Sequence, residues 1–173
     1  MIKKVTLGLI LLQIVFAGCA PTRIWISQPA AFTAANQHYE AELEPLKNGK
    51  NYFNSFRLTI TNKTEKDFTI DWNKTLYLYN NKAYGRFIFA GVNKDNVNNL
   101  PPDFVSAGST LTKIISPLKM VAWKPLKTRQ MDAASFSRGP IPGGENGIYL
   151  VVSQDGQEIP AKITLTIVLK IER

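Results

Sequence analysis

Cysteine and histidine are almost absent from this sequence of 173 residues, which has one of each, Cys19 and His38. A single cysteine excludes an intramolecular disulfide and any zinc site built on cysteine pairs. A single histidine leaves few options for Ser–His or Cys–His hydrolysis, and no Gly-x-Ser-x-Gly segment is present. We expect His38 to be a solvated or capping residue. The sequence therefore predicts no enzyme activity, no cofactor and no metal site.

Acidic residues are also scarce, with 13 Asp and Glu against 21 Lys and Arg. A cell-wall glycosidase would need two carboxylates about 5–10 Å apart in a cleft, whereas most acids here fall in expected turns or on solvent-facing positions. Glu40, Glu42 and Glu44 alternate along one expected strand. Three like charges on one face repel unless water solvates them, so we favour a wet sheet face or a basic partner over a cation site. The phosphate-binding glycine pattern is missing as well.

No apolar run reaches the about 20 residues that a membrane-spanning helix needs. The apolar stretch from Leu7 to Ala17 follows the basic start Met1–Lys4 and is interrupted by Gly8 and Gln13. This pattern is typical of a signal peptide. It ends in Phe16-Ala17-Gly18-Cys19, which resembles the lipobox of bacterial lipoproteins: apolar, small, small, Cys. Phe16 departs from the leucine that is usual in that family.

The resemblance implies a lipid anchor on Cys19. A diacylglyceryl group would be attached to the thiol, the chain would be cut before Cys19, and the new amino group would usually be acylated. Each buried CH₂ contributes about 0.8 kcal/mol and stable anchoring takes more than one chain, so such an anchor is lasting. An ordinary secretory signal that happens to contain a cysteine is the alternative.

The same family carries a sorting rule, by which Asp after the lipidated Cys retains enterobacterial lipoproteins in the inner membrane. Ala20 stands at that position. The resemblance therefore implies the outer membrane, or the outer face of the cytoplasmic membrane in an organism without an outer one. Loss of residues 1–18 would lower the formal charge from +8 to +6. We expect a signal peptide at 1–18, a lipidated Cys with a tether or edge strand at 19–37, and one domain at 38–173.

Sustained helical periodicity is missing after Thr22, whereas alternation with period 2 recurs. The clearest case is the apolar series from Ile163 to Ile171, which follows the strand-like segment 147–154 and the turn pair Asp155-Gly156. Asp-Gly between two such runs predicts a β-hairpin with a type I′ turn. The other expected strands are 23–27, 39–46, 56–61, 68–72, 75–79, 84–90 and 111–116.

Seven to nine short strands with frequent turn signals indicate an all-β fold. The chain loosely resembles the immunoglobulin-like modules of bacterial envelope proteins, which implies an antiparallel β-sandwich and carries no function. We expect a signal-peptide helix to precede this domain. No Cys…Trp…Cys triplet is present. We expect Trp72 and Trp25 to pack in the core or at an edge, and we expect two long loops, 92–108 and 119–146, as the best places for a binding surface.

Loop 119–146 combines basic and aromatic side chains, a mixture that suits lipid headgroups or a carbohydrate–phosphate polymer. A solvated loop with its tryptophan packed on the sandwich is the plainer interpretation. The candidate residues are Lys119, Trp123, Lys124, Lys127, Arg129 and Arg138.

The sequence as a whole favours a membrane-anchored envelope lipoprotein that acts as a non-enzymatic accessory or assembly module. It would contact another envelope protein, for example by strand addition at a sheet edge. The alternative is a periplasmic binder of a lipid headgroup or glycan through loop 119–146. Nucleic acid is not an expected partner of an exported lipoprotein, and the oligomeric state stays open.

Overall fold

A computed structural model describes residues 22–124 and 136–172. The expected signal peptide, Cys19, Lys127 and Arg129 lie outside these described residues. The elements are β1 (Thr22–Gln28), β2 (Phe32–Ala35), β3 (Tyr39–Leu46), β4 (Ser55–Asn62), β5 (Phe68–Ile70), β6 (Leu76–Tyr79), β7 (Lys82–Phe89), β8 (Asp103–Val105), β9 (Thr110–Pro117), the 3₁₀ turn η1 (Leu118–Met120), β10 (Val121–Trp123), β11 (Phe136–Arg138), β12 (Gly144–Gln154) and β13 (Gln157–Glu172).

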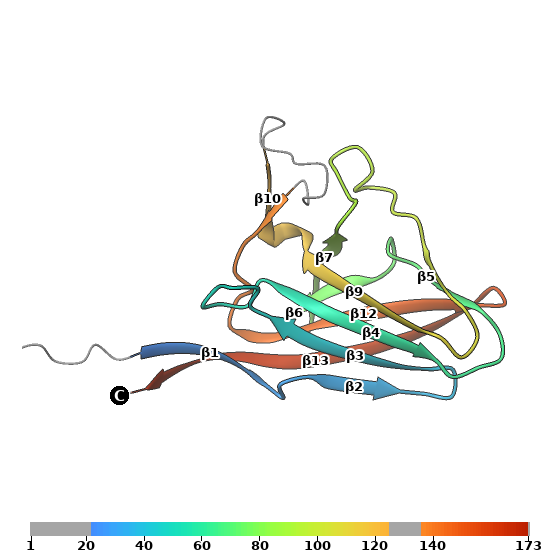
Figure 1. Cartoon of the computed structure of the whole chain (residues 1–173), viewed down its shortest axis with the longest axis horizontal. Helices are drawn as coiled ribbons and strands as arrows, with labels where there is room; N and C mark the ends of the chain where they lie inside the picture. The colour runs from blue at the N-terminus through green and yellow to red at the C-terminus, as the bar shows by residue number, and fades with distance from the viewer. Residues whose placement is uncertain (1–21, 125–135, 173) are drawn as a thin grey trace, which may run out of the picture.

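The predicted all-β class is confirmed. Eleven strands form one antiparallel sheet with the main order β1-β13-β12-β6-β7-β9-β4-β3-β2, in which β5 pairs with β12 and β8 pairs with β5. The strands β10 and β11 form a separate antiparallel pair. The sheet curls on itself, so that its edge strand β2 comes to lie beside β13 along the lower side of Figure 1.

Two β-hairpins close with tight turns whose residue types favour positive φ. The predicted hairpin of β12 and β13 turns at Asp155 and Gly156, which have positive φ values of 52° and 78°. Asn80 and Asn81, at 47° and 63°, close the β6–β7 hairpin in the same manner. Type I′ turns need two residues at positive φ, and Asn, Asp and Gly reach that region at the lowest cost.

The core lies between the facing parts of the curled sheet. In β3 the side chains of Tyr39, Ala41 and Leu43 are buried, whereas Glu40 and Glu42 are exposed, as the alternation predicts. The aromatic ring of Phe56 lies 6.4 Å from that of Tyr77, and Tyr39 lies 6.0 Å from Phe68, so rings from non-neighbouring strands fill the interior. Such tilted ring pairs add to the stabilisation that burial alone provides.

Trp72 is fully buried, and its ring centroid lies 5.0 Å from that of Phe89. Trp25 is partly buried against the core from the edge strand β1. Both tryptophans therefore pack as expected.

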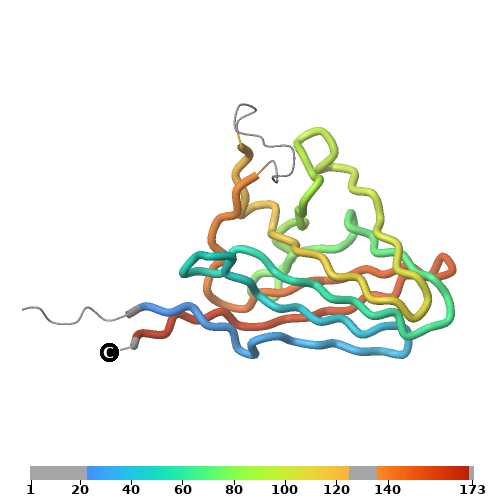
Figure 2. Tube along the Cα trace, viewed as in Figure 1, coloured from blue at the N-terminus to red at the C-terminus, as the bar shows by residue number. Residues whose placement is uncertain are grey.

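The first two strands, β1 and β2, lie at opposite edges of the sheet. β1 pairs with β13 at one end of the strand order, and β2 pairs with β3 at the other. A cis peptide bond between Gln28 and Pro29 lies between them. The Cα trace in Figure 2 follows this change of partner, with β1 running beside the last strand before the chain turns into β2.

Four short strands were not predicted: β2, β8, β10 and β11. Each has three or four residues, too few to establish an alternation of period 2. As a result, the expectation of one continuous loop over 119–146 was wrong in its described part. That segment contains most of η1, the β10–β11 pair and the start of β12 at Gly144. The segment 92–108 likewise contains β8.

Candidate functional site

Lys119 lies on an exposed aromatic surface that a β-bulge creates. Between β6 and β7 the register shifts, so that Tyr77 faces Gly85 and Leu78 faces Ala83, which leaves Tyr84 as the extra residue. Such a bulge redirects a side chain. Tyr84 is 38% exposed, and the Lys119 Nζ lies 4.3 Å from its ring centroid, a cation–π distance.

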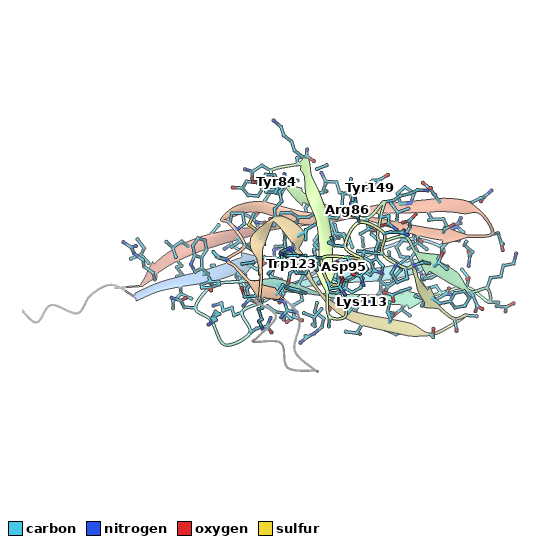
Figure 3. All side chains as sticks on the ribbon, turned by 90° about the horizontal axis from the view of Figure 1, so that it is seen from above. Tyr84, Arg86, Asp95, Lys113, Trp123 and Tyr149 are labelled. Carbon is cyan, nitrogen blue, oxygen red and sulfur yellow. The ribbon has the colours of Figure 1, made fainter. Side chains whose placement is uncertain are left out.

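Lys124 and Arg138 line a separate hollow of about 460 Å³ near the β10–β11 pair. Its other lining residues are Asn48, Lys50, Tyr52, Asn54, Phe136 and Ser137. The lining thus carries three cationic side chains and no carboxylate among the described residues. Lys119 is not part of it, and Figure 3 places Tyr84, the partner of Lys119, well away from Trp123.

A buried polar network fixes the floor of this basic hollow. Arg138 donates from Nε to the Ser116 Oγ at 2.9 Å, and Ser116 donates to the Asn54 carbonyl oxygen at 3.3 Å. The Arg138 guanidinium also lies 5.3 Å from the ring of Phe136. Burial lowers the pKa of Arg138, because no carboxylate among the described residues offsets the loss of solvent. An arginine remains charged under such a shift, so an anionic ligand would meet a positioned cation.

Trp123 is only partly buried, and its ring packs edge-on against Phe136 with centroids 6.2 Å apart. It is therefore a packing residue of the β10–β11 pair. Of the six predicted surface residues, Lys124 and Arg138 lie together, Trp123 supports them from the same strand pair, and Lys119 is separate.

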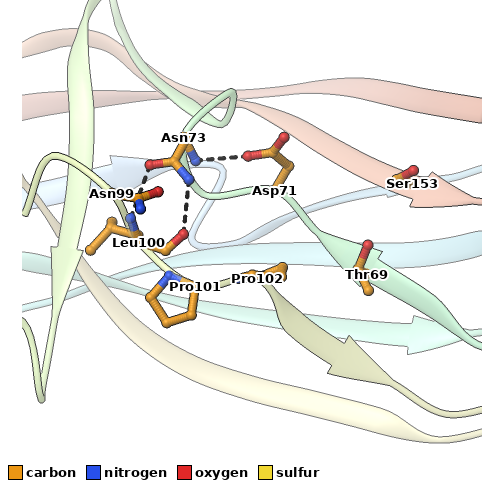
Figure 4. A pocket seen from close by; sticks show the side chains of 8 residues that line it. All are labelled: Thr69, Asp71, Asn73, Asn99, Leu100, Pro101, Pro102 and Ser153. Atoms are coloured by element: carbon orange, nitrogen blue, oxygen red, sulfur yellow. Dashed lines mark hydrogen bonds between the residues drawn. The ribbon is translucent and has the colours of Figure 1, made fainter. Parts of the chain in front are cut away.

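A second hollow, of about 510 Å³, was missed by sequence reasoning. It is open and lies where β5, the β8 approach and β12 meet (Figure 4). The lining residues are Thr69, Asp71, Asn73, Asn99, Leu100, Pro101, Pro102 and Ser153. Asn73 clamps its rim, donating from Nδ2 to the Leu100 carbonyl at 2.8 Å and accepting from the Leu100 N–H at 3.0 Å. The only sequence signal was the Asn-rich, Pro-Pro loop at 92–108.

The strand next to this second hollow, which we call the polar groove, carries the most exposed large apolar side chain among the described residues. Phe104, on β8, is 64% exposed. β8 pairs with β5 alone and is thus an edge strand of the described sheet, although its Val105 carbonyl oxygen accepts a hydrogen bond from the Asn62 Nδ2 at 3.2 Å. An exposed strand edge beside an apolar anchor is the arrangement that strand addition by a partner segment uses.

A charged cluster lies close by, between β8 and β9. The Asp103 carboxylate accepts a hydrogen bond from the Trp72 Nε1 at 2.8 Å and forms an ion pair with Lys113. The Lys113 Nζ lies 3.8 Å from the Phe89 ring centroid and 5.2 Å from that of Trp72. Every charged group in this cluster has a partner, which assigns it a structural role.

The remaining candidates for chemistry are engaged in similar contacts. His38 Nδ1 lies 3.1 Å from the Gln154 Oε1, and its Nε2 lies 3.0 Å from the Gln37 Nε2. Glu44 pairs with Arg57, which fits a solvated face for the glutamate series. Among residues 22–124 and 136–172, no set of three His, Cys, Asp or Glu side chains is arranged to hold a metal ion.

Comparison with known proteins adds no relative. No protein-family model matches the chain, and no curated protein sequence matches it. Within the described part of the chain, no helix has the length and apolar character to cross a bilayer.

Proposed function

We propose that this chain is a lipid-anchored bacterial envelope lipoprotein that acts as a non-enzymatic accessory or assembly module. The observation that carries the proposal is the segment Phe16–Cys19, a lipobox-like end to a signal-like apolar run. Its position also fits the fold. β1 begins at Thr22, so a chain cut before Cys19 would keep only Cys19, Ala20 and Pro21 ahead of the folded domain. Ala20 favours the outer membrane as the destination.

The partner of such a module would be another envelope protein. Support comes from β8, where an edge strand, the exposed Phe104 and the polar groove at Asn73 lie together. A partner segment that added a strand to β8 would gain main-chain hydrogen bonds, a site for one large apolar contact and a polar groove alongside. We also propose that the curled sheet is a divergent immunoglobulin-like sandwich, which the placement of β1 and β2 at opposite edges favours.

The anchor is tested by the intact mass of the protein and by its fractionation. The wild-type chain should carry the mass of a diacylglyceryl group on Cys19 and should float with membranes, whereas Cys19→Ala should lose both properties. A Cys19→Ala chain that still carries acyl mass would overturn the anchor assignment.

The partner surface is tested by placing a photo-crosslinking amino acid at Phe104 in living cells. One discrete envelope protein should be captured from this position. The matched control is the same amino acid at Tyr149, which is exposed at 38% on another strand. Equal capture at both positions, or none at Phe104, would contradict the proposed surface.

The basic hollow favours a second candidate function, the binding of an anionic headgroup or glycan. Lys50, Lys124 and Arg138 converge there without an acidic neighbour among the described residues. Titration of Cys19→Ala protein with inorganic phosphate and with glycerol phosphate should produce NMR shifts that Arg138→Gln abolishes. Lys119→Gln, which lies outside the hollow, is the control. Equal responses in both variants would leave non-specific charge attraction as the explanation.

A further inference from the structure

The last strand carries its apolar face beyond the core. Along β13, Ile163, Leu165 and Ile167 are buried, and the same alternation continues to Leu169 and Ile171. These last two side chains are 40% and 57% exposed. Side chains of alternate residues share one face of a strand, so the buried stripe of the core becomes an exposed stripe at the end of the strand.

This exposed end is a two-stranded ribbon formed by β1 and the final part of β13. Trp25 pairs with Leu169, and Arg23 pairs with Ile171, so these four side chains lie on one face. On the opposite face, Ile24, Ile26 and Val168 are only partly buried. Each face thus combines apolar side chains with one cation, Arg23 on the first face and Lys170 on the second. A two-stranded ribbon with apolar side chains on both faces is marginally stable in water by itself. Figures 1 and 2 show it extending from one end of the molecule.

The ribbon starts almost at the anchor. Three residue steps separate Cys19 from Thr22, the first residue of β1. At about 3.3–3.6 Å per extended residue, they span at most about 11 Å. If acyl chains on Cys19 enter the bilayer, the start of β1 and its partner at the end of β13 must lie at or near the headgroup layer.

The charges at this end suit an anionic surface. Arg23 is exposed on the ribbon, and Lys47 lies close by, because it lines with Trp25 and Phe53 a hollow of about 370 Å³. The acidic Glu44 in the same lining is paired with Arg57. Basic residues are attracted to anionic lipid headgroups, and tryptophan is enriched at the bilayer interface.

We propose that the open end of the β1–β13 ribbon is a membrane-contacting element that places Leu169 and Ile171 in the interfacial layer of the anchoring bilayer. Arg23 would lie among the headgroups, and the domain would extend from the membrane along its long axis. The inference rests on the proposed lipid anchor, and it adds a second, protein-based contact that fixes orientation.

The test uses a fluorescent probe on the full-length, processed chain. Cys19 is the only cysteine, so once lipid blocks its thiol an introduced cysteine is the only reactive one. A nitrobenzoxadiazole probe is attached to Ile171→Cys or, as the control, to Phe104→Cys, which is exposed to a similar extent on β8. Both proteins are reconstituted into vesicles of phosphatidylethanolamine and phosphatidylglycerol, and the intact mass of each sample is recorded.

The probe at Ile171→Cys should shift to the blue, be quenched by lipids brominated on their acyl chains and be protected from aqueous iodide. The probe at Phe104→Cys should remain accessible to iodide. Acylated, vesicle-bound protein whose probe at position 171 stays open to iodide would overturn this inference alone. A probe that is shielded in native membranes but not in pure lipid would also overturn it, in favour of a covering protein. Absence of the acyl mass would overturn the anchor and the inference together.

Discussion

Replacing Asp103 with alanine should destabilise the domain far more than the loss of an ordinary ion pair. The Asp103 carboxylate serves two partners, the Lys113 ammonium and the Trp72 indole, whose Nε1 lies 2.8 Å away. Only 26% of the Asp103 side chain and 21% of the Lys113 side chain is exposed. Asp103→Ala would therefore leave an ammonium group against the Phe89 and Trp72 rings without its counterion and a buried indole N–H without its acceptor.

The magnitude follows from these two losses. Removing one partner of a buried ion pair costs about 3–5 kcal/mol, and leaving a buried donor unsatisfied costs about 1–3 kcal/mol. Both side chains keep some contact with water, which can rehydrate the lysine, so we expect about 2–3 kcal/mol in total. For a domain of this size, that corresponds to a fall in Tm of roughly 4–12 °C. Asp103→Asn keeps an acceptor for Trp72 and should lose less.

Urea unfolding of the Cys19→Ala chain, followed by tryptophan fluorescence and far-ultraviolet circular dichroism, measures the effect. Lys66→Ala is the matched control, because Lys66 also belongs to a lysine–aspartate pair, with Asp155, but both side chains are largely exposed. That control should show no measurable change. A value for Asp103→Ala within about 0.5 kcal/mol of the parent would refute the reasoning, since that range is typical of plain surface substitutions.

Three further outcomes follow from the packing. Gly147→Ala should lower the free energy of unfolding by at least about 2 kcal/mol, because its Cβ would lie 2.2 Å from the Ile163 carbonyl oxygen and the backbone of β13 would have to move. An unchanged Tm would contradict this contact. Burial raises the pKa of Tyr39 to about 12, so Tyr39 loses its proton at a lower pH in the unfolded chain than in the folded one. The free energy of unfolding should therefore fall from pH 10 towards pH 12. Tyr39→Phe should flatten that fall in the urea midpoint, and an equal slope in both proteins would exclude Tyr39 as its source. Gly156→Ala should lower the Tm modestly, because φ at this position is +78°, whereas an increase would show that the turn tolerates a side chain.

The strands that the sequence predicts well are those whose local pattern and tertiary burial agree. β3 begins and ends at the expected residues, Tyr39 and Leu46, because every second side chain enters the core. The β12–β13 hairpin is equally clear, since Asp155-Gly156 meets the conformational demand of the turn without help from distant contacts. In both cases the residues that determine the local structure lie within about ten neighbouring positions.

The polar groove could not be predicted in this way, because its lining comes from three separate segments. Thr69–Asn73, Asn99–Pro102 and Ser153 meet only after the sheet has curled and β8 has paired with β5. None of these residue types carries a recognisable spacing. The ion pair of Asp103 with Lys113 arises from the same tertiary arrangement. Local reasoning could identify the loop 92–108 as a candidate surface, but not the residues that complete it.

The segment 119–146 presents the opposite difficulty, because residues that are close in its sequence lie apart in space. Lys119 and Lys124 are five positions apart, but Lys119 lies within η1 and β10 comes between the two. Lys119 lies on the Tyr84 ring, whereas Lys124 lines the hollow with Arg138. Charges that are close in sequence form one surface patch only if the chain between them stays irregular. Here the strand pairing of Val121–Trp123 with Phe136–Arg138 separates Lys119 from Lys124.

The long hairpin connects the proposed anchor with the proposed partner surface. β13 has 16 residues, which span about 50 Å at about 3.3 Å per residue. Its open end lies three residue steps from the proposed lipid, and its turn at Asp155-Gly156 lies at the other end of the molecule, where Ser153 lines the polar groove (Figure 1). A ribbon seated on the bilayer would therefore present the groove and Phe104 tens of ångströms from the headgroups, where a partner from the periplasm could reach them. Rigid strand pairing, not a flexible tether, would set that distance, because only Ala20 and Pro21 separate Cys19 from β1.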